Sequence, residues 1–170
     1  MNRPLIGISV GDPAGIGPEI TARALSLREI YELCRPLVVA EAEMMKEAIR
    51  FSRLDLKLQT VSSPKEGLYR FGTIDLLDLK NLDGRSIKHK TISADYGRAS
   101  FEYVKKVIEL AISKEIDATV TGPISKEAIN LAGFHYSGHT EIYADLTQTK
   151  QYAMMLVHDQ FRVIHVSTHV

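Results

Sequence analysis

The sequence predicts an α/β fold in which helices cover both faces of a mostly parallel sheet. Three observations support this fold class. Apolar strand-like segments alternate with helix-like segments along all 170 residues. The composition, 45% hydrophobic and 25% charged, is typical of a globular protein with a buried core. The helix-like segments are amphipathic, so each needs a sheet or another helix to cover its apolar stripe. We therefore expect residues 1–170 to form a single α/β region.

The first half begins as strand, loop and helix, and a second strand and helix follow. The predicted elements are a strand over 4–10, a Gly/Pro-rich loop over 11–18, a helix over 19–33, a strand over 37–40 and a helix over 41–52. The pattern weakens over 54–90, where alternating apolar residues predict two or three short strands with loops between them.

The second half contains the clearest helix of the chain. It starts near Asp95 and carries one apolar stripe, formed by Phe101, Val104, Val107, Ile108 and Ala111. A strand over 116–120 then leads to a helix over 126–131, with Ser125 as its N-cap and Gly133 at its end. Two further strands, over 152–157 and 162–167, flank a tight connection and predict an antiparallel pair, which would make the sheet mixed if it joined.

Charge and composition exclude several classes of protein. Lys plus Arg and Asp plus Glu each number 21, so the basic field that non-specific nucleic-acid binding needs is missing. No apolar run approaches the ~20 residues that span a bilayer. The N-terminus shows no secretion signal, and the single cysteine, Cys34, has no intrachain disulfide partner, so we expect a cytoplasmic protein without a membrane or nucleic-acid partner.

The first segment that could carry chemistry is the loop Gly11–Glu19, between the first predicted strand and helix. Gly15 and Gly17 match half of a dinucleotide-binding fingerprint, but Pro18 and the absence of a third glycine break it, and P-loop spacing is absent too. The structural interpretation is a tight turn in which Pro18 starts the helix. The alternative is contact of the loop amides with an anion or substrate.

The second and third segments follow the strand over 116–120. Lys126 opens a helix beyond the end of that strand, where open α/β sheets bind ligands, although a first-turn lysine is often only solvated. His139 and Thr140 stand in a polar cluster next to Gly138, where imidazolium and hydroxyl donors could bind a phosphate or a substrate hydroxyl. The alternative for Thr140 is a helix cap preceding Glu141.

The fourth segment is His165–His169. On a strand, residues four apart share a face about 13 Å apart, so these two histidines cannot hold one ion between them. A single histidine is not a metal site, and no other His/Asp group has ligand spacing. A structural histidine is the default interpretation unless further chain supplies the other ligands.

Taken together, these segments resemble the 4-hydroxythreonine-4-phosphate dehydrogenase family, which includes D-threonate and D-erythronate 4-phosphate dehydrogenases. The matching stretches occur in family order along the whole chain: GDPAGIGPEI at 11–20, TGPISKEAINLAG at 121–133, YSGHTE at 136–141, YAMML at 152–156 and VIHVSTH at 163–169. Family members have roughly double this length and two α/β/α subdomains, similar to isocitrate and isopropylmalate dehydrogenases. The resemblance therefore implies that residues 1–170 are the N-terminal half of a two-subdomain enzyme.

The resemblance implies oxidation of the secondary hydroxyl of a phosphorylated 3-hydroxy acid by NAD or NADP, followed by decarboxylation of the keto acid. It also implies a divalent metal (zinc, magnesium, cobalt or manganese) and a homodimer. By match to the family motifs, His139 and Thr140 bind substrate, and His169 is one of three histidine metal ligands. The resemblance also makes Lys126 and Asp12 cleft residues, with Lys126 as the candidate catalytic residue, and no residue is assigned to the cofactor. The stretches at 152–156 and 165–169 favour the D-threonate/D-erythronate type over the vitamin B6 (pyridoxine) biosynthetic type.

Two other functions stay open at this point. If the chain truly ended at Val170, a catalytically incomplete binding or assembly module would be expected, because the other metal ligands would be missing. A metal-dependent hydrolase using His139 and His169 lacks an acid or base carboxylate that the sequence places beside them.

Overall fold

The structure, a computed structural model, describes residues 3–82 and 87–165 and divides them into two compact units, 1–135 and 136–170. The first unit contains a five-stranded parallel sheet in the order β3-β4-β2-β1-β5. The strands are β1 (Leu5–Ser9), β2 (Arg35–Ala40), β3 (Lys57–Val61), β4 (Thr73–Asp78) and β5 (Ala118–Thr121). The α/β fold class is therefore confirmed.

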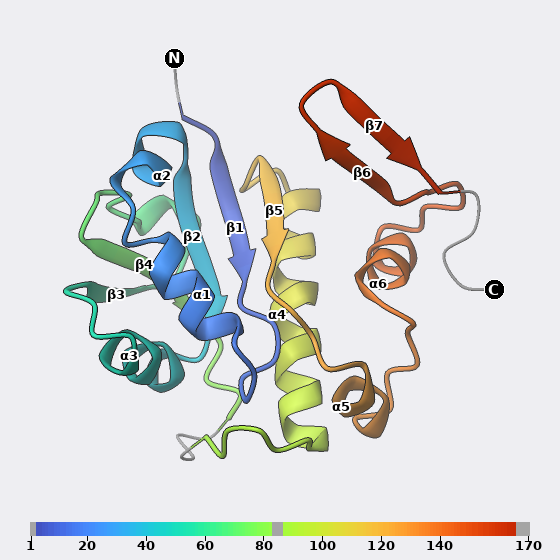
Figure 1. The fold of residues 1–170 in the computed structure, drawn as a ribbon, viewed down its shortest axis with the longest axis horizontal. Helices are drawn as coiled ribbons and strands as arrows, with labels where there is room; N and C mark the ends of the chain where they lie inside the picture. The colour runs from blue at the N-terminus through green and yellow to red at the C-terminus, as the bar shows by residue number, and fades with distance from the viewer. Residues whose placement is uncertain (1–2, 83–86, 166–170) are drawn as a thin grey trace. The chain divides into compact units, whose positions relative to one another are not determined.

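Helices lie on both faces of this sheet, as Figure 1 shows. One face carries α1 (Gly17–Ala24), α2 (Arg28–Leu33) and α3 (Ala42–Phe51), and the other carries the long helix α4 (Ala94–Ile112). α4 packs against β1, β2 and β5. The short helix α5 (Lys126–Leu131) packs against α4.

The central strand explains why the sheet needs cover on both faces. Leu37, Val38 and Val39 of β2 are all 0% exposed, so consecutive side chains on opposite faces are buried alike. Such an uninterrupted apolar run is characteristic of a parallel strand between two helical layers. The apolar stripe of α4 supplies one of these layers, since Val104, Val107 and Ile108 are buried as the spacing predicts.

The single helix predicted over 19–33 is wrong, because the chain forms two helices there. α1 ends at Ala24, and Leu27 is extended before α2 begins at Arg28. The Ser26 hydroxyl donates a hydrogen bond of 2.7 Å to the carbonyl oxygen of Arg23. Serine side chains compete in this way with the helical hydrogen-bond pattern, a signal that apolar spacing alone does not carry.

The other predicted elements of the first unit are confirmed with small shifts of their ends. Residues 54–90 contain two strands, β3 and β4, and a short 3₁₀-helix at Pro64–Glu66. The Ser125 hydroxyl caps α5 by accepting a hydrogen bond of 3.2 Å from the amide of Ala128, and Gly133 ends the segment with a φ of +90°.

The second unit contains α6 (His139–Leu146) and an antiparallel hairpin of β6 (Met155–His158) and β7 (Phe161–Ile164). The hairpin confirms the predicted antiparallel pair, with a connection of only two residues. It forms a sheet of its own, so the five-stranded sheet is parallel throughout and the mixed variant is wrong for the described residues. Within those residues, no helix is long and apolar enough to cross a membrane.

Candidate functional site

The strand order places two of the sequence motifs side by side. From β1 the chain adds β2, β4 and β3 on one side, and it adds β5 on the other side. The loops that follow β1 and β5 therefore leave the sheet as neighbours, at the point where open α/β sheets form their ligand crevice. These loops carry the segments that begin at Gly11 and at Gly122.

Hydrogen bonds and close backbone contacts join the two loops. The amide of Asp12 donates to the carbonyl oxygen of Pro123 at 2.9 Å, and the amide of Gly122 donates to that of Ser9 at 2.7 Å. A Cβ at residue 122 would collide with the carbonyl oxygen of Val10. Gly11 has a φ of +82°, and a Cβ there would collide with the carbonyl oxygen of Pro123. Close backbone packing therefore explains why both positions are glycine. For Gly11 this favours the structural interpretation of the loop after β1.

Asp12 organises the turn that follows. Its carboxylate accepts a hydrogen bond of 2.9 Å from the amide of Ala14, and its carbonyl oxygen accepts one of 3.1 Å from the amide of Gly15. Burial raises the pKa of the Asp12 carboxyl, and the hydrogen bond from Ala14 partly opposes that rise. Three amides of the loop, those of Asp12, Ala14 and Gly15, therefore donate within the protein, which leaves fewer donors for an anion.

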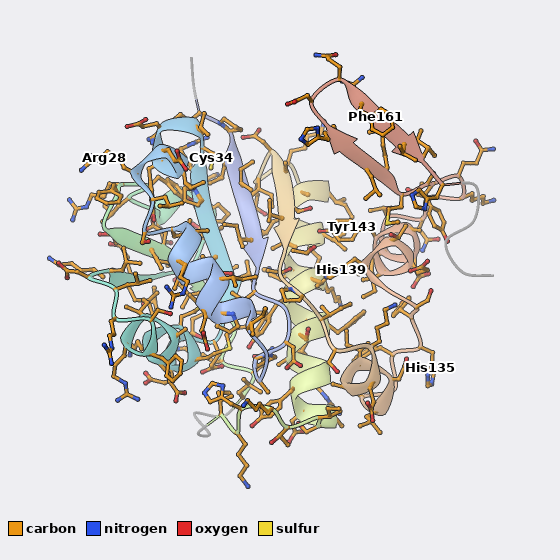
Figure 2. The ribbon with its side chains drawn as sticks, viewed as in Figure 1. Arg28, Cys34, His135, His139, Tyr143 and Phe161 are labelled. Atoms are coloured by element: carbon orange, nitrogen blue, oxygen red, sulfur yellow. The ribbon has the colours of Figure 1, made fainter. Side chains whose placement is uncertain are left out.

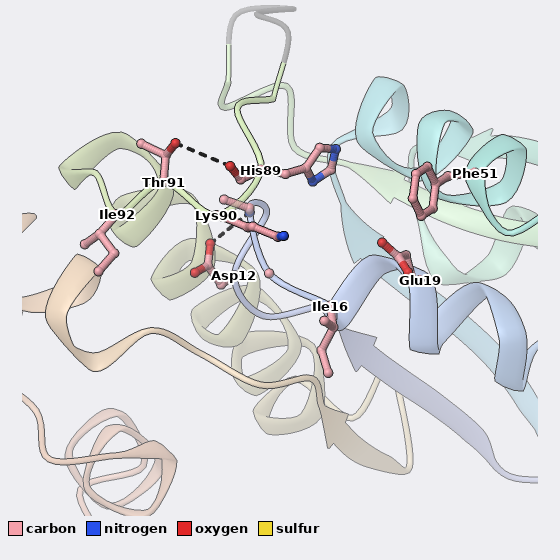
Figure 3. Close-up of a pocket in the computed structure, with 10 residues that line it drawn as sticks. Asp12, Ile16, Glu19, Phe51, His89, Lys90, Thr91 and Ile92 are labelled. Carbon is pink, nitrogen blue, oxygen red and sulfur yellow. Dashed lines mark hydrogen bonds between the residues drawn. The ribbon is translucent and has the colours of Figure 1, made fainter.

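A cleft of about 470 Å³ opens beside this turn (Figure 3). Its wall combines the apolar side chains of Ile16, Phe51 and Ile92 with polar groups that include Asp12 and Lys90. A mainly apolar wall with a few polar groups is the usual character of a small-molecule site. The cleft belongs entirely to the first unit, because all its lining residues lie between Asp12 and Ile92.

The segment over 89–92 is the part of this cleft that sequence reasoning missed. The amide of Lys90 donates to the carbonyl oxygen of Ala14 at 3.2 Å, which holds the segment against the loop after β1. His89 lies 3.6 Å from the carboxylate of Glu47, measured from Nε2 to Oε1. The available signal was the basic run Lys88–Lys90, but it falls in the weakly patterned stretch, and only the fold brings it to the cleft.

Lys126 stands in the first turn of α5, directly after the Ser125 cap, and its side chain is exposed. α5 is held firmly on α4. Gly97 of α4 has no room for a Cβ because the carbonyl group of Ala128 approaches it, and the rings of Phe101 and Phe134 stack with centroids 3.9 Å apart. The predicted position of Lys126 on a first helical turn is confirmed, and its catalytic role stays a prediction.

His139 and Thr140 belong to the second unit, where they form the first turn of α6. The N-cap is Gly138, so the alternative interpretation of Thr140 as the cap is wrong. Both side chains are half-buried. The hydroxyl of Tyr136 donates a hydrogen bond of 2.6 Å to Asp145, which ties the start of this segment to the far end of the helix. Figure 2 labels His139 on this helix.

The metal prediction rests on residues outside the described part of the chain. His169 lies beyond residue 165 and is not described. His165 extends the hairpin, because its amide donates to the carbonyl oxygen of Met154 at 3.4 Å. Among residues 3–82 and 87–165, no group of three or more His, Cys, Asp or Glu side chains could hold a metal ion. The described residues therefore do not by themselves fit a metal centre.

Comparison with known proteins places this chain in a family. Relatives from Symbiobacterium thermophilum and Clostridium botulinum, both provisionally named D-threonate 4-phosphate dehydrogenase, are 44% and 41% identical over 99% of this chain. A crystal structure of a 4-hydroxythreonine-4-phosphate dehydrogenase from Burkholderia phymatum is similar over 100% of this chain, with 39% identity and a TM-score of 0.93. The chain spans about half the length of these relatives, 50–51% of each. Because residues 32–170 also match the family described as pyridoxal phosphate biosynthetic protein PdxA, the chain belongs to the PdxA family.

Proposed function

We propose that the complete polypeptide is an NAD- or NADP-dependent dehydrogenase that oxidises the 3-hydroxyl of a phosphorylated hydroxy acid, with decarboxylation of the keto acid that forms. The carrying observation is the match of 99% of this chain to relatives named D-threonate 4-phosphate dehydrogenase at 41–44% identity. Because those names agree with the motif preference at 152–156 and 165–169, we propose D-threonate 4-phosphate or its erythronate isomer as substrate, ahead of 4-hydroxythreonine 4-phosphate.

In this proposal His139 and Thr140 bind the substrate. They are consecutive in the first turn of α6, and their half-buried side chains combine an imidazole with a hydroxyl donor. Such groups bind phosphate or hydroxyl oxygens. Partial burial strengthens each hydrogen bond relative to one at a fully exposed position, because the local dielectric constant is lower. Lys126 is the proposed catalytic group, an exposed ammonium on a helix that packs against α4.

The nicotinamide cofactor accepts the hydride when it is bound, and the divalent metal is assigned to His169 together with ligands that the described residues do not supply. The homodimer implied by the family resemblance is part of the same proposal. The cleft beside Asp12 is well placed at the crevice of the sheet, but we assign no step of the reaction to it.

The direct test is turnover by the purified complete polypeptide. D-Threonate 4-phosphate, D-erythronate 4-phosphate and 4-hydroxythreonine 4-phosphate are each supplied with NAD or NADP and a divalent metal, and reduced nicotinamide and carbon dioxide are measured. We expect formation of both products with at least one of the first two substrates. A folded protein that turns over none of the three would refute the proposal and favour a binding or assembly module.

The substrate-binding role is tested by His139→Ala. Loss of one hydrogen bond to a charged substrate group costs about 1.5–3 kcal/mol, so we expect kcat/KM to fall by roughly 10- to 100-fold. The matched control is His158→Ala, since that side chain is 90% exposed at the turn of the hairpin and has no assigned role. Equal effects of the two substitutions would contradict the assignment of His139.

A further inference from the structure

Helix α6, whose first turn carries the proposed substrate-binding residues, begins without a side-chain cap of its own. α4 and α5 begin with serine caps, whose hydroxyls accept hydrogen bonds of 3.2 Å from amides of the first turn. The N-cap of α6 is Gly138, which has no side chain that could do the same. A helix of eight residues is also too short to be stable by itself. Another contact is therefore needed to fix the start of α6.

The hydrogen bond between Tyr136 and Asp145 is such a contact. The hydroxyl of Tyr136, two residues before the cap, donates to a carboxylate oxygen of Asp145 in the last turn of α6 at 2.6 Å. Hydrogen bonds to an ionised group are roughly twice as strong as bonds between neutral groups. The bond to the carboxylate also raises the pKa of the Tyr136 hydroxyl, so the donor keeps its proton well above neutral pH.

Helix stability does not explain the carboxylate at position 145. The C-terminal end of a helix carries a partial negative charge, which disfavours an acidic side chain in the last turn. Residues 143–146 include no basic side chain that could offset this effect. Packing does not explain Asp145 either, because the residue is exposed. A role as the acceptor for the Tyr136 hydroxyl accounts for an acidic residue at this position.

We infer that Tyr136 is a positioning residue for substrate binding. Its hydrogen bond to Asp145 fixes the start of α6 and so holds the side chains of His139 and Thr140 in the orientation that contacts the substrate. These two residues lie three and four positions after Tyr136, between the two ends of the bond. The inference rests on the proposed function, which gives His139 and Thr140 the substrate, and it places neither Tyr136 nor Asp145 on the substrate itself.

Loss of this bond should weaken substrate binding without slowing the chemical step. In Tyr136→Phe the first turn of α6 samples other orientations, and only the productive one binds. The dissociation constant and KM should rise by roughly 2- to 10-fold, the effect of one ordinary hydrogen bond on a conformational equilibrium. Because the ground state and the transition state lose the same interaction, kcat should change by less than about twofold. A general loss of folded protein would instead lower kcat and leave KM unchanged.

The test uses the complete polypeptide and the three phosphorylated acids named above, with binding measured by calorimetry and turnover by steady-state kinetics. Tyr136→Phe and Asp145→Ala should have the same effect, and the double variant should be no worse, because all three lack the same bond. Asp145→Asn keeps an oxygen acceptor and should bind substrate nearly as the parent does. Tyr152→Phe is the matched control, because it removes the same group from a side chain that is 53% exposed outside α6.

Hydrogen exchange of the substrate-free protein supplies a measurement that does not depend on activity. The amides of residues 137–142 should exchange faster in Tyr136→Phe than in the parent or in Tyr152→Phe. The amides of α4 should exchange at the same rate in all three proteins, because the bond lies entirely within the second unit.

Several results would overturn the inference and leave the proposed function intact. One is a KM in Tyr136→Phe that stays at the parent value, and another is a raised KM with no change in hydrogen exchange. An equal effect of Tyr152→Phe would do the same, as would effects of Tyr136→Phe and Asp145→Ala that add in the double variant. A parent protein that binds none of the three acids would instead refute the proposed function, and with it the inference that rests on it.

Discussion

At the residue scale, the loops after β1 and β5 meet because several positions have no side chain. A Cβ at Gly17 or at Gly122 would collide with the carbonyl oxygen of Val10. Because this oxygen belongs to the backbone, it cannot rotate away as a side chain could. Gly15 differs, since a Cβ there would meet its nearest atom, the Cβ of Asp12, at 3.5 Å. In the loop after β1, packing therefore requires glycine at position 17 but leaves room for a larger residue at position 15.

We predict that Gly122→Ala destabilises the protein, because the new methyl group must push two backbone segments apart. Overpacking of this kind typically costs 1–3 kcal/mol. Urea denaturation gives the change in the free energy of unfolding. Gly15→Ala is the matched control, and its expected change is within about 0.5 kcal/mol. A similar loss in both variants would contradict the packing explanation.

A second residue-scale prediction concerns Tyr69 at high pH. Burial, with a contribution from the nearby Asp75 carboxylate, raises the pKa of the Tyr69 hydroxyl from 10.0 to about 12. This hydroxyl donates a hydrogen bond to the carbonyl oxygen of Pro64. Between these pH values the unfolded chain loses the proton first, so the stability that protonated Tyr69 contributes below pH 10 is lost as the pH rises toward 12.

The measurement is the free energy of unfolding of the parent protein and of Tyr69→Phe at several pH values across that window. We expect the curve of the parent to fall more steeply than that of the variant, because phenylalanine has no proton to lose. Parallel curves would show that Tyr69 does not contribute to the alkaline loss of stability.

At the element scale, the apolar stripe of a helix and its capping residue correctly predicted that a helix forms. Apolar spacing alone did not predict where one helix ends and the next begins. The stripe of α4 and the Ser125 cap of α5 were both predictable, because each depends on residues within one or two helical turns. The break between α1 and α2 was missed, since the apolar spacing runs through it and the hydrogen bond of Ser26 to the Arg23 carbonyl is not part of that spacing. The hairpin was predicted, but its separation from the main sheet was not.

We predict a sharp contrast between two isoleucines of α4. Ile108 is 2% exposed, whereas Ile112, one turn later, is 58% exposed. Ile108→Ala removes buried methyl groups and leaves a cavity, which costs about 2–5 kcal/mol. Ile112→Ala should change the free energy of unfolding by about 0.5 kcal/mol or less if that position is also exposed in the complete protein. A large loss at Ile112 would instead reveal that another part of the polypeptide covers it.

At the scale of the whole molecule, the proposed metal centre is the part of the site for which the described residues do not supply a ligand set. We predict that chelator treatment of the complete polypeptide abolishes the proposed dehydrogenase activity and that a divalent metal restores it. His169→Ala should weaken metal affinity by at least about tenfold, measured by calorimetry, because losing a ligand costs no less than losing a residue that orients one. His158→Ala is the control. Unchanged metal affinity in His169→Ala would remove that residue from the ligand set.

The sequence by itself determined the fold class, most elements and the family resemblance, because these depend on short-range patterns: apolar periodicity, caps, glycine turns and ordered motifs. Only the tertiary structure decided that the loops after β1 and β5 lie side by side, since this depends on the pairing of β5 with β1, the first strand of the chain. The same holds for the cleft beside Asp12, whose residues His89 and Lys90 come from a stretch without a clear pattern. Contacts between residues far apart in the chain leave little trace in local spacing, and so they had to be seen in three dimensions.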